Sequence, residues 1–470
     1  MDFSREWGLD ANVIEKDYVL GWVLAGIYNH DELGSEWIFK GGTCLKKCYF
    51  ETYRFSEDLD FTIKKPDHLN NDYLINAFKD IADWVYENTG NEIPKDSIEF
   101  DFYTNPRGKI SVQGKISYRG PMQRRGNLPR IKLDITDDEL LVLDSPSREV
   151  HHPYSDRTEE GIYILCYSFE EEYAEKVRAL AERLRPRDLY DVVHMHRHDT
   201  LRTNRDLILS TLKKKCEFKG ISLPTMEILK NKPERAELEA EWGNMLAHQL
   251  PVLPPFEQFW QELPEVFEWL YRAVEKVVRP AIPSKGIEID ETWRVPAMAH
   301  AWHATAPLEI IRFAAANRLC VDLKYNNTHR LIEPYSLRRT KDGNLLLYAV
   351  RHNTGEDRSY RVDRIQGATA IKTPFTPRYV VELTATGPIS APPTKRTSSV
   401  YGLTNTGKTK ISRSRTRSRS MYFGPKYVIE CTYCGKKFNR KSYTSSLNAH
   451  KDKSGYPCPG RVGYMVDVKY

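Results

Sequence analysis

Long hydrophobic runs are missing from this chain of 470 residues. The longest apolar stretch, roughly Val19–Tyr28, is too short for a helix that crosses a bilayer. The first residues, MDFSREWGLD, lack the basic and then apolar pattern of a secretion signal. Internal repeats are missing too. We therefore expect a cytoplasmic protein without a membrane partner, and the length predicts several domains rather than one core.

Cysteine is too sparse for a disulfide framework, since the chain has only eight. Five of them lie inside apolar segments and are expected to be small, reduced core residues: Cys44, Cys48, Cys166, Cys216 and Cys320. The other three lie close together near the C-terminus and need a different explanation.

Acidic residues are scarce at the end of the chain. Residues 395–470 contain 17 Lys and Arg against 3 Asp and Glu, a net charge of +14, so with +6 overall the preceding residues carry −8. Such a basic segment is typical of nucleic-acid contact, although a solvated, disordered tether is an alternative compatible with it. Residues 386–424, which include SRSRTRSRS, are predicted to be a flexible basic linker.

An acidic pair ends the segment FKGGTCLKKCYFETYRFSEDLDF at residues 39–61. On a strand, Asp58 and Asp60 would project to the same side, about 7 Å apart along the chain. Two such carboxylates repel each other unless a cation lies between them, and Mg²⁺ (or Mn²⁺) prefers hard oxygen ligands. A third carboxylate for a second metal ion would come from Asp134, on the alternating strand of KLDI.

A glycine pair precedes these acids in the same segment. Gly41 and Gly42 would let backbone N–H groups approach phosphates closely, and Thr43 would add a hydroxyl. Either feature alone has a plain explanation, because D-x-D occurs by chance and Gly-Gly is usually a turn. Together with the later strand-borne acid they favour a site for a nucleoside triphosphate and its metal ion.

These residues carry a resemblance to a known family. The segment above, KLDI and EEEYAEKVRALAERLRPRDLYDVV resemble the AbiE-type nucleotidyltransferase toxins of bacterial abortive-infection and toxin–antitoxin systems, in the DNA polymerase β-like superfamily. The early helix VIEKDYVLGWVL resembles theirs as well, and the resemblance covers roughly Met1–Lys230. It implies a catalytic lobe with a mixed sheet and a helical lobe, which we expect over residues 1–235.

The resemblance also implies roles for individual residues. It points to Gly42 and Thr43 for the phosphates, Asp58 and Asp60 for the metal ion, Lys176 for the triphosphate and Asp191 as a further essential acid. Asp134 is the matching third acid. Without the resemblance, Lys176 would read as the exposed partner of Glu172, four residues earlier on a helix.

Hydrophobic periodicity predicts the main elements. Helical spacing is found at residues 12–28, from 170 onward, at 186–195 and at 206–215, and alternation typical of strands at 59–63, 110–119 and 129–137. We expect a helical and linker region at 236–306. Within it, residues 251–283 are predicted to be a helix and linker interrupted by prolines.

The segment at 307–385 resembles a WYL domain, through PLEIIRFAAANRLCVDLKY and RLIEPYSLRRTKDGNLLLYAVRHNTGEDRSYRVDRIQGA. That implies a helix followed by a small Sm-like β-barrel that binds nucleic acid or nucleotide ligands. Its basic and aromatic residues would suit phosphates and base stacking: Arg338, Arg339, Tyr360 and Arg361. The alternative is that they are merely solvated.

The C-terminal segment at 425–470 has the spacing of a zinc site. Cys431 and Cys434 form C-x2-C, and His450, expected on a helix as in small ββα fingers, would complete four ligands with Cys458. Four protein ligands predict structural Zn²⁺. Three basic residues would make this module a nucleic-acid contact: Lys436, Lys437 and Arg440.

The sequence thus predicts an α+β multidomain protein with a polymerase-β-like nucleotidyltransferase lobe, a helical lobe, a small barrel and a zinc-binding module. We expect a Mg²⁺-dependent enzyme, a toxin or phage-defence effector that transfers NMP from an NTP to RNA, with a tRNA 3′ end as the acceptor implied by the family, or to a protein. The family also implies an antitoxin partner. The alternative is a nucleic-acid-binding regulator whose transferase lobe is inactive and only senses nucleotide.

Overall fold

The computed structural model describes two parts of the chain. The first is residues 9–384, apart from 52, 106, 125, 159, 199–203, 273–278 and 294–306; the second is 426–469, apart from 441–444, 449 and 452–456. Contacts divide the chain into two units, Met1–Lys395 and Arg396–Tyr470, which we treat separately. The predicted linker at 386–424 lies outside the described residues. None of the helices described in these two parts is long and apolar enough to span a membrane.

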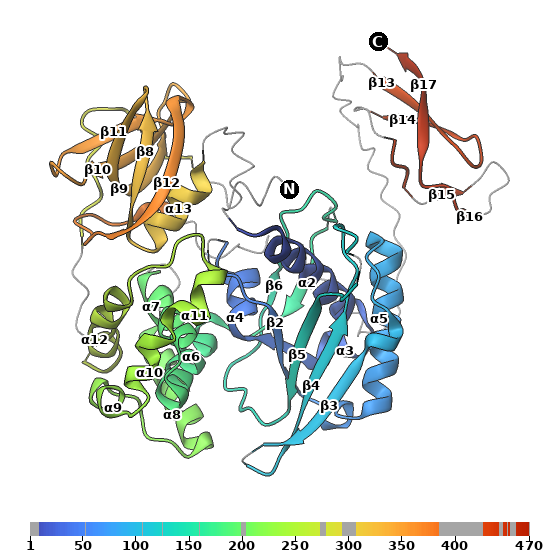
Figure 1. Cartoon of the computed structure of the whole chain (residues 1–470), viewed down its shortest axis with the longest axis horizontal. Coiled ribbons are helices and arrows are strands. Elements are labelled where there is room, and N and C mark those ends of the chain that lie inside the picture. The colour runs from blue at the N-terminus through green and yellow to red at the C-terminus, as the bar shows by residue number, and fades with distance from the viewer. Residues whose placement is uncertain are drawn as a thin grey trace, which may run out of the picture. The chain divides into compact units, whose positions relative to one another are not determined.

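The first unit opens with a mixed five-stranded sheet in the order β1-β2-β5-β4-β3 (Figure 1). Strands β2 and β5 pair in parallel, and the other neighbours are antiparallel. This confirms the predicted mixed sheet. The strands are β1 (Trp37–Lys40), β2 (Asp58–Ile63), β3 (Glu99–Thr104), β4 (Ile110–Ser117) and β5 (Arg130–Thr136).

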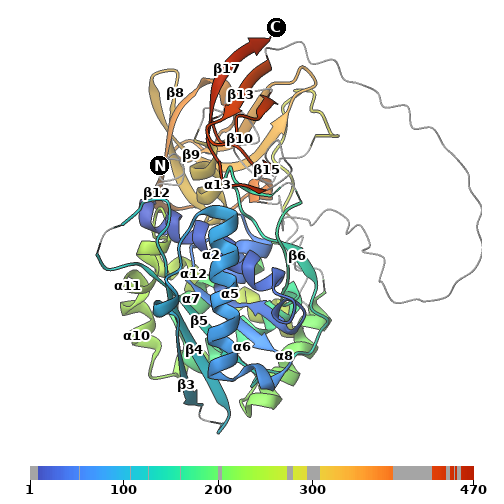
Figure 2. The same ribbon diagram turned by 90° about the vertical axis from the view of Figure 1, so that its right-hand side faces the viewer.

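One face of this sheet is apolar and covered by two long helices. Helices α2 (Ala11–Asn29) and α5 (Asn71–Thr89) lie side by side there (Figure 2). Alternation along β2 buries Leu59 and Phe61 in the core, where Trp37 packs between Phe61 and Phe78 of α5. The polar residues between them therefore lie on the opposite face.

Short elements connect β1 to the rest of this lobe. Helix α4 (Gly41–Cys44) follows β1 directly and continues as the π-helix η1 (Leu45–Tyr49). The others are α3 (Leu33–Glu36), the 3₁₀ turns η2 (Pro66–His68) and η3 (Lys95–Ser97), and the paired strands β6 (Ser147–Glu149) and β7 (Tyr163–Leu165).

The helical lobe follows at residue 169. The side chain of Ser168 caps α6 by accepting a bond from the N–H of Glu171, and Pro186 begins α7 at a position where a helix needs no N–H donor. Ring stacking of Phe259 on Tyr190, 5.1 Å apart, joins α12 to α7. The helices are α6 (Phe169–Arg183), α7 (Pro186–Arg197), α8 (Arg205–Lys219), α9 (Met226–Asn231), α10 (Arg235–Ala240), α11 (Trp242–Leu246), η4 (Ala247–Gln249) and α12 (Phe256–Arg272).

A second sheet completes the first unit, in the order β11-β10-β9-β8-β12 with all neighbours antiparallel. Helix α13 (Leu308–Ala316) precedes it. No ladder joins the edge strands β11 and β12 among the described residues, so the predicted barrel is not confirmed. The elements are β8 (Leu319–Tyr325), β9 (Thr328–Arg339), β10 (Leu345–Arg351), β11 (Asp357–Arg361), η6 (Val362–Arg364), β12 (Ile365–Pro374) and η7 (Glu382–Thr384).

The second unit consists of strands within its described residues. A three-stranded sheet has the order β14-β13-β17, and β15 pairs with β16. The strands are β13 (Lys426–Cys431), β14 (Lys437–Arg440), β15 (His450–Lys451), β16 (Pro457–Cys458) and β17 (Gly463–Lys469). The predicted helix around His450 is wrong, because the N–H of Leu447 donates to Arg461 and His450 pairs with Cys458 across a strand ladder.

Candidate active site

Three carboxylates lie on the polar face of the first sheet. The parallel register of β2 and β5 sets Asp60 beside Asp134, and Asp58 lies two residues before Asp60 on the same face. The amide of Gln113 on β4 donates to the carboxylate of Asp134 at 3.3 Å. The two acids of the motif and the predicted third acid are thus brought together by strand pairing.

The ionised forms of Asp58 and Asp60, the two acids of β2, are disfavoured in the folded protein. Burial and the charge of Asp134 raise the pKa of Asp60 to about 6, although Lys40 and Lys176 act against this. Burial also raises the pKa of Asp58. Like charges gathered on one partly buried face are stabilised by a divalent cation, and hard oxygen donors suit Mg²⁺ or Mn²⁺. The donor set therefore fits the predicted metal ion.

The glycine loop, by which we mean Gly41 and Gly42 at the start of α4, is packed directly against these acids. Gly41 has φ +83°, and a Cβ there would lie 2.2 Å from a carboxylate oxygen of Asp60. A Cβ on Gly42 would lie 2.5 Å from the Arg54 guanidinium. Both positions therefore need glycine for space, and Gly41 needs it for conformation as well.

Thr43 has a structural partner in the loop. Its buried hydroxyl donates to the backbone carbonyl of Asp58 at 2.5 Å. The sequence predicted that this hydroxyl would bind a phosphate. In the structure its proton forms a hydrogen bond that links α4 to the first residue of β2. The contact fixes the distance between the loop and the acids.

Lys176 and Asp191 belong to one buried ionic cluster. The ammonium of Lys176 lies 2.8 Å from the carboxylate of Asp191. Arg54 donates two hydrogen bonds, of 2.6 and 2.7 Å, to the same carboxylate. Tyr53 donates a further hydrogen bond to it. Burial raises the pKa of Asp191, but Arg54 and Lys176 lower it well below its usual range. The interpretation of Lys176 as an exposed partner of Glu172 is wrong, because its side chain is only 8% exposed.

Glu172 is a site residue that sequence reasoning missed. One carboxyl oxygen accepts the backbone N–H of Gly41 at 2.5 Å, and the other is buried without a hydrogen-bond partner among the described residues. Burial raises the pKa of Glu172 to about 8, although Lys176 and the Gly41 N–H lower it. The only available signal was its helical spacing from Lys176, which suggested a surface pair.

Comparison with known proteins identifies the transferase part of the chain. Residues 22–271 match the family described as "Nucleotidyl transferase AbiEii toxin, Type IV TA system", which is more than half of the chain. The chain belongs to the AbiEii nucleotidyltransferase toxin family. Residues 307–370 match the WYL domain. The AbiEii match runs through α12, so the helices after residue 235 continue the helical lobe.

Two solved structures are similar to this AbiEii family member. One is MenT4, a nucleotidyltransferase toxin from Mycobacterium tuberculosis, at 17% identity, 56% of this chain, 85% of that chain and a TM-score of 0.39. The other is JHP933 from Helicobacter pylori, at 16% identity, 56% of this chain, 94% of that chain and a TM-score of 0.37. No curated protein matches the chain.

The residues predicted to bind nucleic acid in the WYL domain already contact other side chains of the same chain. Tyr360 is only 4% exposed and packs edge-on against Tyr325, so its ring has no open face for base stacking. The three arginines each pair with a carboxylate of the chain: Arg338 with Glu382 at 2.8 Å, Arg339 with Asp290 at 2.5 Å and Arg361 with Asp363 at 2.7 Å. Arg339 and Arg361 are the more exposed of the three.

The four predicted zinc ligands converge in the second unit. Their ligand atoms all lie within 4.8 Å of one another, with Cys431 and Cys458 sulfurs 3.9 Å apart and Cys434 sulfur 3.3 Å from His450 Nε2. A tetrahedral zinc ion would set such atoms about 3.8 and 3.6 Å apart, so the residues fit the ion. His450 Nδ1 donates to the carbonyl of Asn448, which leaves Nε2 to coordinate.

One of the three predicted nucleic-acid contacts has a partner within the sheet. Lys437 on β14 lies 3.4 Å from Glu430 on the adjacent strand. Lys436 directly precedes β14. The side chain of Arg440, at the end of β14, lies outside the described residues.

Proposed function

We propose that the chain transfers a nucleoside monophosphate from an NTP to a hydroxyl of a nucleic acid, with release of pyrophosphate. The observation that carries this proposal is the alignment of Asp58, Asp60 and Asp134 on one face beside the glycine loop. RNA is the acceptor we propose, a tRNA 3′ end in the first place. The family's Type IV toxin–antitoxin description supports an antitoxin as a further partner.

Asp58, Asp60 and Asp134 would hold Mg²⁺ or Mn²⁺ in this reaction. When bound, the divalent cation neutralises triphosphate charge and lowers the pKa of an attacking hydroxyl. The chain's own part is to keep three carboxylates on one rigid sheet face, so that the site needs little rearrangement when it is filled. Strand pairing between β2 and β5 supplies that rigidity.

The glycine loop and Lys176 would position the triphosphate. Glu172 accepts a hydrogen bond from the N–H of Gly41. Because its pKa is raised to about 8, its carboxyl is largely protonated at neutral pH and adds little negative charge beside the phosphates. Asp191 is a positioning residue, because it fixes both Lys176 and Arg54 without lying on the polar sheet face. Lys176 could then offer its remaining N–H donors to phosphate oxygens.

The second unit would contribute acceptor binding. Its four-ligand group, built from Cys431, Cys434, His450 and Cys458, fits structural Zn²⁺, and residues 395–470 carry a net charge of +14. A basic module of this kind binds phosphate backbones, so acceptor affinity should fall steeply with salt. In the proposed function, the second unit serves acceptor recognition rather than chemistry.

The experiment compares α- and γ-labelled NTPs with the purified full-length protein. Each NTP is incubated with Mg²⁺ and, in separate reactions, total RNA, purified tRNA or protein alone. Label from the α-phosphate, and not from the γ-phosphate, should appear on RNA and disappear with EDTA. Label on protein alone would replace the proposed acceptor, and no transfer from any NTP would favour the inactive nucleotide sensor.

A further inference from the structure

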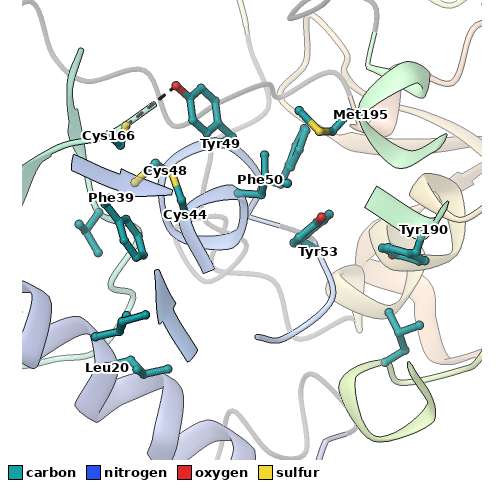
Figure 3. Packing of buried hydrophobic residues seen from close by; sticks show 14 of the residues in the cluster. Leu20, Phe39, Cys44, Cys48, Tyr49, Phe50, Tyr53, Cys166, Tyr190 and Met195 are labelled. Carbon is teal, nitrogen blue, oxygen red and sulfur yellow. Dashed lines mark hydrogen bonds between the residues drawn. The ribbon is translucent and has the colours of Figure 1, made fainter. Parts of the chain in front are cut away.

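Three cysteine side chains meet directly behind the glycine loop. The sulfur atoms of Cys44, Cys48 and Cys166 all lie within 4.8 Å of one another, and all three residues are fully buried (Figure 3). None of them forms a disulfide. The sequence suggested only that each is a small core residue. Their convergence is a feature of the folded chain.

Two neighbouring elements and one crossing strand bring the sulfurs together. Cys44 ends α4 and Cys48 lies in η1, so the short helical segment after the loop presents both sulfurs on one side. Cys166 follows β7 and bridges to Phe39 of β1, and its N–H donates to Pro146 at 3.1 Å. Each thiol is therefore held by rigid backbone rather than by a flexible loop.

We propose that Cys44, Cys48 and Cys166 form a binding site for a soft monovalent metal ion, Cu(I). Thiolate sulfur is a soft ligand that favours Cu(I), whereas Mg²⁺ and Ca²⁺ require oxygen. A metal–sulfur bond of about 2.3 Å would set three coplanar sulfurs about 4 Å apart, which the observed cluster permits. Zn²⁺ requires a fourth ligand, and no His, Asp or Glu joins this group among the described residues.

A basic side chain lies beside the cluster. Cys166 Sγ lies 3.8 Å from the carbonyl of Pro146 and 4.0 Å from the hydroxyl of Tyr49. Arg148 is held in place by a bond of 3.1 Å to the carbonyl of Cys48 and by stacking over the Tyr49 ring at 4.3 Å. A fixed cation thus lies close to the sulfurs and offsets the negative charge of a copper–thiolate group.

Binding would be a simple exchange of protons for metal. Cu(I) binds as the S–H protons of Cys44, Cys48 and Cys166 leave to solvent and their sulfurs coordinate the ion. No electron is transferred, since copper enters and stays as Cu(I). The site is independent of the proposed transferase reaction, although Cys44 directly follows Thr43 of the loop.

The experiment titrates the reduced, full-length protein with Cu(I) without oxygen, against a chromogenic Cu(I) chelator. Because the second unit has its own thiols, the titration is done in the Cys431→Ser/Cys434→Ser background as well as in the wild-type protein. Cys48→Ala and Cys166→Ala test the site, and Cys216→Ala, another buried cysteine outside the cluster, is the matched control. Circular dichroism melts establish that the first unit of each variant, which contains the three cysteines, is folded.

We expect one tightly bound Cu(I) in the Cys431→Ser/Cys434→Ser background, with a thiolate-to-copper absorption band in the near ultraviolet. In that background, Cys48→Ala or Cys166→Ala should weaken binding by more than about 100-fold, since loss of a mere outer-shell partner already costs 10–100-fold. Cys216→Ala should leave binding unchanged. Equal affinity in folded Cys48→Ala, Cys166→Ala and Cys216→Ala proteins, or no tight copper in the background, would overturn the proposal.

Discussion

Asp191 pairs with two buried cations at once. Its carboxylate accepts bonds from both Arg54 and Lys176, and all three side chains are almost completely buried. The cluster joins α6 and α7 to the segment between the glycine loop and β2. One carboxylate therefore connects the helical lobe to the loop that would hold the nucleotide.

We expect Asp191→Ala to destabilise the first unit strongly. Removing one partner of a buried ion pair leaves the other charge unpaired and costs about 3–5 kcal/mol. The control is Asp83→Ala, which breaks an exposed pair with Lys95 and should cost less than about 1 kcal/mol. Urea unfolding measures both free energies. Equal losses in the two variants would contradict the buried cluster.

At the scale of elements, two junctions can be tested: the turn from β1 into α4 at the proposed site, and the contact between the transferase part and helix α13. The first sets a left-handed glycine against Asp60. In the second, Arg312 of α13 lies 3.1 Å from Glu51 and 3.0 Å from Glu309. Each junction makes a testable prediction.

We expect Gly41→Ala to abolish most activity. The new Cβ would overlap the Asp60 carboxylate, and a displacement of about 1 Å in such a site can cost about 100-fold in rate. Gly90→Ala is the matched control, because Gly90 has a similar φ of +75° with nothing within 4 Å of the added Cβ. Gly90→Ala should lose only the stability that the left-handed backbone costs and should keep nucleotide transfer, whereas folded Gly41→Ala should lose transfer. Equal activity in the two folded variants would contradict the site.

The Glu51 junction should make stability depend on pH. Burial raises the pKa of Glu51 to about 7, despite Arg312, so the folded state binds its proton more tightly than the unfolded state. Stability from this group is therefore present at low pH and is lost as pH rises from about 4.5 to about 7. Urea unfolding at pH 5 and pH 8 should show a smaller decline in Glu51→Gln than in the wild-type protein. An identical decline would contradict the raised pKa.

Local patterns sufficed for much of this architecture. Alternation predicted β5 and hence Asp134, and helical spacing predicted α6 and α7. Lys176 and Asp191 on these helices were predicted from the family resemblance. Glu172 was missed because its role depends on a backbone N–H 131 positions earlier in the chain. The helix expected at His450 was wrong because backbone pairing with residues 457–463, which no local pattern reveals, makes the segment extended.

At the scale of the whole molecule, opposite charges are separated along the chain. The 394 residues before Lys395 carry −8, and the remainder carries +14. Among the described residues of the second unit, the apolar cluster is small and includes two of the predicted ligand cysteines, with Cys434 packed against it, so the proposed zinc ion would contribute much of the stability of the sheet. The proposed acceptor binding by this unit should therefore depend on zinc.

Chelation of zinc should unfold the second unit alone. Structural zinc contributes about 10–16 kcal/mol to modules of this size, so Cys434→Ala should have the same effect as chelation. Tyr433→Ala, in the same turn but 72% exposed, is the control. Amide NMR should show loss of the β13–β17 signals with those of the first unit unchanged, and the acceptor KM should rise while the NTP KM stays constant. Retention of the β13 sheet without zinc would contradict this account.

The central claim is that the carboxylates on β2 and β5 perform nucleotide transfer, and the most direct measurement is single-turnover transfer of α-labelled nucleotide to RNA. Asp60→Asn removes a carboxylate charge without changing its shape, and Asp101→Asn on β3 is a control at an exposed acid that pairs with Lys115. The account predicts at least about 100-fold slower transfer for Asp60→Asn and wild-type rates for Asp101→Asn. Wild-type transfer by folded Asp60→Asn protein would contradict it.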